Sequence, residues 1–196
     1  MALTRLNWSG VQQSQPRVYK CGYCGKVVSS ILGWQGSKPP DQNQPDVPVT
    51  LQLCPNCMYP TFFGVDQQIP DVAPGEEVQG LPADVENLYR EARNCVAASA
   101  YTGAVLCARK LLMSIAVAQG DQPGKNFFEY VEFLANKGFV PPNGRGWVDH
   151  IRSKGNEATH EIRMMSRPDA EQLITFIEML LKFIYEFPSR VPIKTP

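Results

Sequence analysis

The sequence predicts a mainly α protein, in which an up-and-down helical bundle follows a small β unit at the N-terminus. Two observations predict this fold class. Residues 81–188 place apolar side chains at helical spacing, with proline and glycine between the repeats. Residues 1–66 instead carry short apolar runs separated by glycine and proline, which is typical of short strands and turns.

The helical part is expected to contain five helices joined by short links. The first starts at Pro82, whose fixed φ suits a first helical turn. The second, Tyr101–Ala118, is apolar nearly all round and is therefore the candidate central helix. The remaining helices are expected over 127–137, from about Gly144 with Trp147 and Ile151 facing inward, and over 169–187, where Pro188 closes the last.

Composition divides the chain into four segments. We expect a small β unit over 1–66, a linker over 67–80, the helical bundle over 81–188 and a tail over 189–196. The linker prediction rests on its prolines, glycines and acidic residues, which interrupt regular structure.

The overall charge excludes a global electrostatic attraction to nucleic acid or acidic lipid, because the formal net charge is +0. No apolar run approaches the length of a bilayer, so we expect no transmembrane helix and no membrane partner. The first residues also lack the apolar centre of a signal peptide. A cytoplasmic protein is the resulting expectation.

Two CxxC pairs predict a metal centre. Cys21 and Cys24 form the first pair, Cys54 and Cys57 form the second, and both lie among glycine, proline and strand-like residues. Four thiolates suit tetrahedral Zn²⁺, and a complete set of four leaves no open position for catalysis. We therefore expect a structural zinc ion in a zinc ribbon. The alternative is a redox or disulfide pair, although the βαβ unit of a thioredoxin-like motif is missing from the pattern.

The other two cysteines are not expected to bind metal. Cys95 and Cys107 fall on predicted helices and are expected to be buried small side chains.

Arg152, Asn156 and His160 are spaced i, i+4, i+8, so a continuous helix would align them in one polar stripe. Such a stripe could bind a phosphodiester and transfer a proton. The alternative is that these side chains are solvated or cap the helix end.

Residues 81–187 resemble a prokaryotic domain of unknown function that belongs to the HEPN superfamily. The segments that carry the resemblance are LPADVENLYREARNC, YTGAVLCARKLL, IRSKGNEATHE and DAEQLITFIEMLLKFIYEF. The resemblance implies a helical bundle, often dimeric and often preceded by a zinc ribbon. It also implies a role in RNA cleavage or binding, in phage defence, toxin–antitoxin or mobile-element systems.

The resemblance makes Arg152, Asn156 and His160 the candidate catalytic residues. The sequence departs from the family motif at Gly155, where the motif has arginine, and Arg152 lies one turn earlier. Arg109, Lys154 and Arg163 are the candidate RNA-binding residues, although Arg109 could equally extend to solvent.

Enzymatic activity therefore stays open. One hypothesis is a metal-independent endoribonuclease. The other is a non-catalytic module that binds RNA, another nucleic acid or a protein partner from the same operon, or that serves only to dimerise.

Overall fold

The computed structural model describes residues 7–36, 49–140, 146, 148, 149, 151 and 164–190. The chain divides into two compact units, Met1–Ala73 and Pro74–Pro196, which we call the sheet unit and the helical unit. Each unit has its own core, so each is described by itself.

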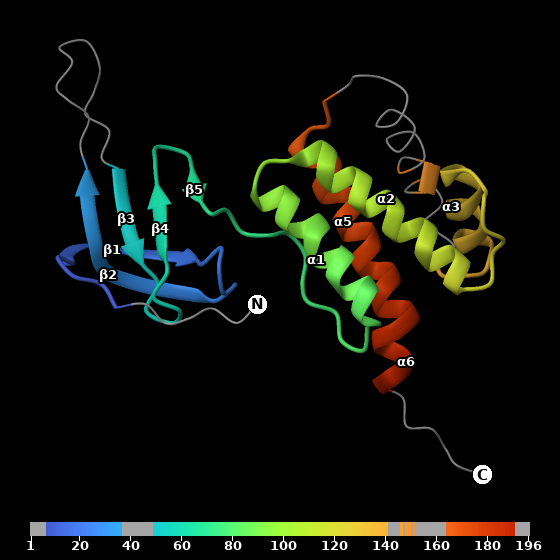
Figure 1. Cartoon of the computed structure of the whole chain (residues 1–196), viewed down its shortest axis with the longest axis horizontal. Helices are drawn as coiled ribbons and strands as arrows, with labels where there is room; N and C mark the ends of the chain where they lie inside the picture. The colour runs from blue at the N-terminus through green and yellow to red at the C-terminus, as the bar shows by residue number, and fades with distance from the viewer. Residues whose placement is uncertain are drawn as a thin grey trace. The chain divides into compact units, whose positions relative to one another are not determined.

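The sheet unit is a five-stranded antiparallel sheet with the strands in sequence order (Figure 1). The valines and leucines beside the cysteines lie in its strands, as the sequence predicted. The strands are β1 (Gln12–Lys20), β2 (Val27–Gly36), β3 (Val49–Leu53), β4 (Pro60–Phe63) and β5 (Gln68–Ile69).

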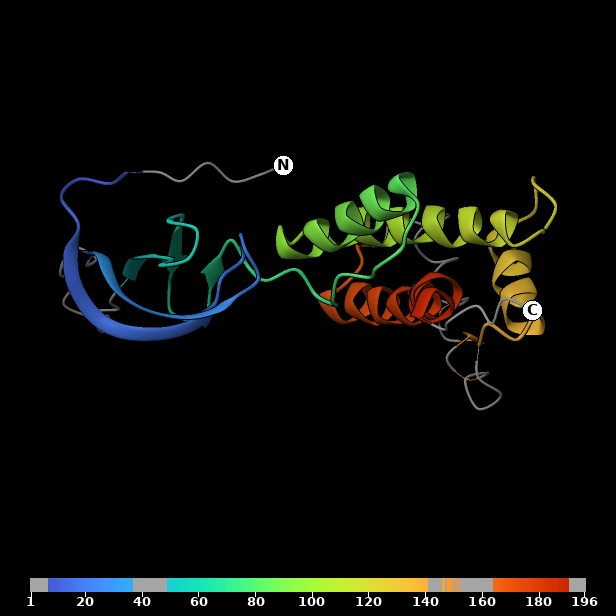
Figure 2. The same ribbon diagram turned by 90° about the horizontal axis from the view of Figure 1, so that it is seen from below.

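Strand β1 bends and covers one face of the sheet. Its register against β2 shifts between Gln13 and Arg17, where Pro16 cannot donate a ladder hydrogen bond. Figure 2 shows β1 and β2 as long, strongly curved strands. The bend allows the Ser14 hydroxyl to accept a hydrogen bond of 2.8 Å from Gln52 Nε2, and it brings Tyr19 edge-on to Phe63 with ring centroids 4.9 Å apart.

The helical unit contains α1 (Ala83–Ala97), α2 (Tyr101–Ala118), α3 (Phe127–Asn136) and α5 (Arg167–Leu181), followed by a π-helical turn η2 (Lys182–Glu186) and α6 (Phe187–Arg190). Helix α2 packs against α1, α3 and α5. Its Leu111, Leu112 and Ile115 are 0% exposed, which confirms the prediction of a central helix. Val148 and Ile151 are helical and buried in the same core.

The expectation of a mainly α protein built on an up-and-down bundle is wrong. The chain is a mixed α and β protein, because β1 and β2 reach nine and ten residues and belong to a five-stranded sheet. The helices do not all run up and down either. Helix α3 has only 10 residues before Gly138 turns the chain with φ 82, and both views show it crossing the end of α2 (Figures 1 and 2).

Helix α2 also differs from the expectation that no apolar segment has the length of a bilayer. Its 18 residues have a mean hydropathy of 1.4, so by length and composition alone the helix could cross a membrane. Central helices of folded domains pass the same test, and the inward face of α2 forms the core of the helical unit.

Residues 74–80, which fall in the predicted linker, are hydrogen-bonded to the helical unit. Arg93 donates to the carbonyls of Pro74 and Gly75 at 2.7 Å each. The Tyr89 hydroxyl donates to the Glu76 carbonyl, and Val78 is buried in the helical core. Two carboxylates on the last helical stretch complete the attachment, since Glu178 accepts from the Glu76 backbone N–H and Glu186 from the Gln79 backbone N–H, both at 3.1 Å.

The last helix extends further than its sequence predicts. It begins at Arg167 because Ser166 and Asp169 form a capping box, and it continues past Pro188. Proline inside a helix loses a hydrogen bond and crowds the carbonyl four residues earlier. The wider turn of η2 directly precedes Pro188, and we infer that it relieves this crowding.

Candidate metal centre

Two matching turns position the four cysteines of the CxxC pairs. In the first turn, the Gly25 N–H donates to the Cys21 carbonyl at 2.8 Å; in the second, the Met58 N–H donates to the Cys54 carbonyl at 2.8 Å. The first turn joins β1 to β2 and the second joins β3 to β4. Antiparallel pairing of the strands therefore brings the two turns to the same end of the sheet unit.

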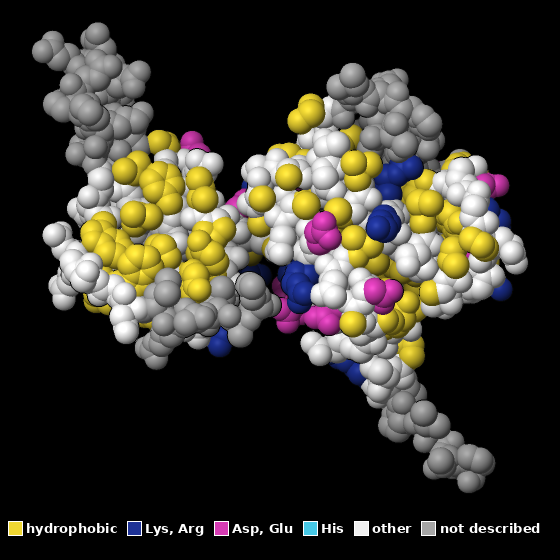
Figure 3. Space-filling model, viewed as in Figure 1, with side chains coloured by type: hydrophobic (Ala, Val, Ile, Leu, Met, Phe, Trp, Pro, Cys, Tyr) yellow, Lys and Arg dark blue, Asp and Glu magenta, His cyan; other side chains and the backbone are white. Residues whose placement is uncertain are grey.

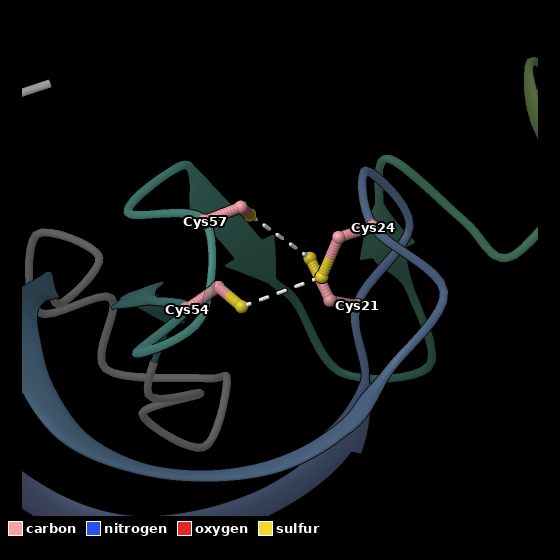
Figure 4. Close-up of side chains that lie close together, drawn as sticks. All are labelled: Cys21, Cys24, Cys54 and Cys57. Carbon is pink, nitrogen blue, oxygen red and sulfur yellow. Dashed lines mark hydrogen bonds between the residues drawn. The ribbon is translucent and has the colours of Figure 1, made fainter. Parts of the chain in front are cut away.

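The four sulfur atoms converge, as Figure 4 shows. All four lie within 4.8 Å of one another, and the Cys21–Cys57 and Cys24–Cys54 sulfur pairs are each 3.8 Å apart. A tetrahedron of thiolates at about 2.3 Å from zinc has sulfur–sulfur edges of about 3.8 Å. The cluster therefore has both the donor set and the spacing of a metal centre.

The surroundings of the cluster shift the pKa values of the individual thiols in different directions. Burial raises the pKa of the Cys21 thiol and of the Cys57 thiol. Burial acts in the same direction at Cys24, but hydrogen bonds from the Lys26 backbone and the Asn56 side chain outweigh it and lower the pKa of Cys24 to about 7. Cys24 is thus ready to ionise near neutral pH, and a bound cation would favour the thiolate form of all four.

Side chains on both turns tie them together. The Lys26 ammonium donates to the Asn56 side-chain carbonyl at 3.4 Å, and the Tyr23 and Tyr59 rings lie 4.9 Å apart. Trp8 adds a contact from the N-terminal segment, because its indole N–H donates to the Met58 carbonyl at 2.7 Å.

An apolar row crosses the sheet on the face opposite the Tyr19–Phe63 contact. Residues directly opposite one another on paired strands share a face, so the register of β2, β3, β4 and β5 places four apolar side chains in line. Leu51 is 39% and Ile69 is 48% exposed. Figure 3 shows hydrophobic side chains gathered over this unit. The row consists of Trp34, Leu51, Phe62 and Ile69, with the Trp8 ring edge-on to Trp34.

Comparison with known proteins identifies the helical part of the chain. The family model for a domain of unknown function, DUF4145, matches residues 90–195, which is more than half of the 196 residues. The chain belongs to this family. No curated protein and no solved structure matches the chain at a significant level. The DUF4145 match begins inside α1, so the four clustered cysteines lie outside it.

The structure describes only part of the predicted polar site within the DUF4145 region. Arg109 lies on α2 and is partly buried, with its guanidinium carbon 4.3 Å from the centre of the Phe127 ring. Arg152, Lys154, Asn156, His160 and Arg163 lie outside the described residues, so their roles stay predictions.

The two remaining cysteines also lie in the DUF4145 region. Cys95 is on α1 and Cys107 is on α2, and both are half-buried against the helical core. Burial raises the pKa of the Cys107 thiol. The sequence predicted buried side chains at both positions, and the structure places both only partly buried at the edge of the helical core.

Sequence reasoning missed the apolar row and the stacking of Arg109 on Phe127. The alternation of Val49, Leu51 and Leu53 in β3 does signal an apolar face. The partners of these residues depend on strand register, which the alternation alone does not determine. The Arg109–Phe127 contact depends on how α3 crosses α2, for which we find no signal in the sequence.

Proposed function

We propose that Cys21, Cys24, Cys54 and Cys57 bind one structural zinc ion. The observation that carries this proposal is the convergence of four sulfur atoms within 4.8 Å, from two turns of matching geometry. Bound zinc would join the β1–β2 turn to the β3–β4 turn. The sheet unit needs such a link because, among its described residues, the buried cluster around the cysteines contains only two large side chains, Tyr19 and Phe63.

A structural role is favoured over a catalytic one by the donor set. Four thiolates complete the tetrahedron, whereas catalytic zinc keeps one position for water or substrate. Cys21 and Cys54 are also 0% exposed, as is usual for the ligands of a structural site, whereas Cys24 and Cys57 are partly exposed.

The test is metal content under conditions where only tightly bound ions remain. We expect one zinc per chain in the wild-type protein and strongly reduced zinc in Cys54→Ser. Cys107→Ser is the matched control, because it removes a thiol from the helical unit and should leave one zinc per chain. A wild-type ratio well below one, after purification without chelator, would refute the zinc proposal.

We further propose that the protein is a non-catalytic binder of RNA, acting in a prokaryotic defence or mobile-element system. The apolar row supports this proposal, because aromatic side chains on a sheet can stack on the bases of a single strand. Trp34 and Phe62 supply two rings in the row and Trp8 adds a third beside Trp34. The resemblance of residues 81–187 to the HEPN superfamily supports RNA as the partner. A protein from the same operon is the alternative partner for the apolar row.

Binding of single-stranded RNA oligonucleotides tests the proposal. Leu51→Glu places a charge in the centre of the row and should weaken binding roughly tenfold, because losing one stacked base costs about 1–3 kcal/mol. Val65→Glu is the matched control: Val65 is 68% exposed on the same unit, and the same charge change there should leave affinity nearly unchanged. Equal effects of both variants, or no RNA binding by the zinc-loaded wild type, would contradict the proposal.

The resemblance of the segment that carries Arg152, Asn156 and His160 to the HEPN motif supports a second candidate function, a metal-independent endoribonuclease. In that mechanism His160 would take a proton from the attacking 2′-hydroxyl while Arg152 stabilises charge on the phosphate. His160→Ala should then abolish RNA cleavage while leaving the thermal unfolding midpoint unchanged. Cleavage that persists in His160→Ala would exclude this assignment.

From the same resemblance we propose that the protein is a homodimer, and the cytoplasmic location expected from the sequence stays a proposal. Sedimentation equilibrium of the zinc-loaded protein measures the oligomeric state directly. A monomer at concentrations well above those used for RNA binding would contradict the dimer.

A further inference from the structure

Two cysteines outside the metal centre lie on neighbouring helices of the helical unit. Cys95 is on α1 and Cys107 is on α2, and both are half-buried at the edge of the helical core. Residues 98–100 join the two helices, which pack against each other and run in opposite directions along one interface (Figures 1 and 2). Neither thiol has a part in the zinc site or in the proposed RNA contact.

The sulfur of Cys95 reaches across this interface to α2. A Cβ at Gly103 would lie 3.7 Å from the Cys95 sulfur, which is an ordinary van der Waals contact. Gly103 and Cys107 are four residues apart, so they share one face of α2 with their Cβ positions about 5–6 Å apart. The Cys95 sulfur therefore lies over the helical turn that immediately precedes Cys107.

The directions of the two side chains reduce the remaining separation. Side chains of an α-helix lean toward the N-terminus of their own helix. Because α1 and α2 run in opposite directions, Cys95 leans toward the level of Cys107, and Cys107 leans toward Gly103. The proximity also has an electrostatic effect, since burial, the Glu91 carboxylate and the Cys95 thiol all raise the pKa of Cys107.

We propose that Cys95 and Cys107 form a reversible disulfide across the α1–α2 interface, with a small-molecule disulfide such as oxidised glutathione as the oxidant. A disulfide requires Cβ atoms about 3.5–4.5 Å apart, so the two helices must approach closely. Gly103 permits this approach because it has no side chain between them. The thiol pair lies in the helical unit, and it goes beyond the functions proposed for the metal centre and the apolar row.

The reaction consists of two thiol–disulfide exchanges. In the first, the Cys95 thiolate attacks one sulfur of oxidised glutathione, forms a mixed disulfide and releases one glutathione thiolate. In the second, Cys107 gives its proton to water, attacks the Cys95 sulfur and releases the second glutathione thiolate. Two electrons pass from the cysteines to glutathione, and the two released thiolates take up the two protons. We assign the first attack to Cys95 because burial and Glu91 raise the pKa of Cys107.

Peptide mapping of the full chain after incubation with oxidised glutathione tests the disulfide. Trypsin cleaves after Arg93 and Arg109, so both cysteines fall in one peptide, 94–109. When free thiols are alkylated before digestion, we expect this peptide to remain unalkylated and to be lighter than its reduced form by two hydrogen atoms. Excess dithiothreitol should restore the reduced form.

Three results would overturn the proposal. They are a peptide that stays doubly alkylated, a glutathione adduct of the wild type that never closes, and a covalent dimer of the peptide, which would mean that the thiols pair between chains. Peptide 94–109 contains none of the four metal-centre cysteines. Its redox state is therefore read independently of whether the zinc and RNA proposals hold.

Variants of the two helices test the arrangement of the groups. Cys107→Ser should stop after the first step and keep glutathione on Cys95. Glu91→Gln removes a carboxylate that raises the pKa of Cys107, so the mixed disulfide should close roughly threefold faster than in the wild type. Glu86→Gln is the matched control, because Glu86 is an exposed acid on the same helix and its loss should leave the closure rate unchanged. Equal closure rates in Glu91→Gln and Glu86→Gln would contradict the placement of Cys107 at this interface.

Discussion

Gly25 and Met58 occupy equivalent positions in the two cysteine turns, each directly after the second cysteine of a CxxC pair. Their φ values are 68° and 63°, so both adopt the left-handed conformation. Each N–H donates to the carbonyl of the first cysteine in its pair. One turn therefore meets its backbone requirement with glycine, and the other holds a side chain in a conformation that side chains disfavour.

The first prediction is that Gly25→Ala destabilises the zinc-loaded sheet unit by about 1 kcal/mol, the cost of a left-handed conformation for a residue with a Cβ. The effect is purely conformational, because a Cβ at Gly25 would meet no atom within 4 Å. Urea unfolding followed by tryptophan fluorescence measures it in a Trp147→Phe background, where the remaining tryptophans, Trp8 and Trp34, both belong to the sheet unit.

The control for this prediction is Met58→Gly. Glycine relieves the left-handed strain but adds conformational freedom to the unfolded chain, and the two effects are of similar size. We expect little net change in the free energy of unfolding. Gly25→Ala with wild-type stability would show that the turn does not need the left-handed conformation.

The second prediction concerns removal of the metal. A chelator should unfold the sheet unit. In the Trp147→Phe background this is detected as a shift of the tryptophan emission maximum to longer wavelength, while far-UV circular dichroism retains the helical signal. The reason is that the helical unit has its own extensive core, whereas the cysteine cluster organises the small core of the sheet unit. Simultaneous loss of both signals would mean that the two units unfold together.

The third prediction is a dependence of stability on pH at Asp121, which is 7% exposed and accepts a hydrogen bond of 2.5 Å from Lys125. Burial alone would raise the pKa of Asp121, but the hydrogen bonds from Lys125 and the Gln122 N–H, together with the Lys125 charge, hold it below its ordinary value. A carboxylate with a lowered folded-state pKa stabilises the protein above the unfolded pKa of about 3.9, and this contribution is lost as the pH falls through the folded-state value.

Asp121→Asn should therefore unfold at a lower midpoint than the wild type at neutral pH, and the difference should shrink as the pH falls below about 4. Thermal unfolding at a series of pH values measures the difference. Asp84→Asn is the control, because Asp84 is an exposed acid in the first turn of α1 and has no such buried ion pair. A pH-independent difference for Asp121→Asn would contradict the prediction.

The fourth prediction compares two leucines on α2. Leu112 is 0% exposed at the centre of the helical core, whereas Leu106 is 46% exposed on the same helix. Leu112→Ala should cost about 2–5 kcal/mol, because it creates a cavity, and Leu106→Ala should cost less than about 1 kcal/mol. Chemical unfolding followed by circular dichroism measures both, and similar costs would indicate that the outward face of α2 is covered in solution.

Local patterns explain which parts of the structure could be predicted. Helix α2 begins and ends where its sequence indicates, because Tyr101 starts the apolar repeat and Gly120 follows its end. The convergence of the cysteines was also predictable, since a pair of thiols two residues apart shares one turn and four thiols satisfy one tetrahedral ion.

Features that depend on long-range packing could not be predicted. The curvature of β1 follows from an irregular register around Pro16, and the crossing of α3 over α2 follows from how the cores fill, which no local pattern encodes. The chain after Phe187 was expected to leave the helix at Pro188, but the wider turn before it lets the helix continue. In each case tertiary contacts override a local preference.

The attachment of residues 74–80 determines where the protein can be divided. A fragment that starts at residue 74 keeps the hydrogen bonds from Arg93 and the buried Val78. A fragment that starts at residue 81, next to α1, would lack the Gln79 N–H that donates to the Glu186 carboxylate. This loss matters because Glu186 is only 5% exposed. The natural boundary for producing the helical unit alone therefore lies sixteen residues before the DUF4145 match begins, at Pro74 rather than at residue 90.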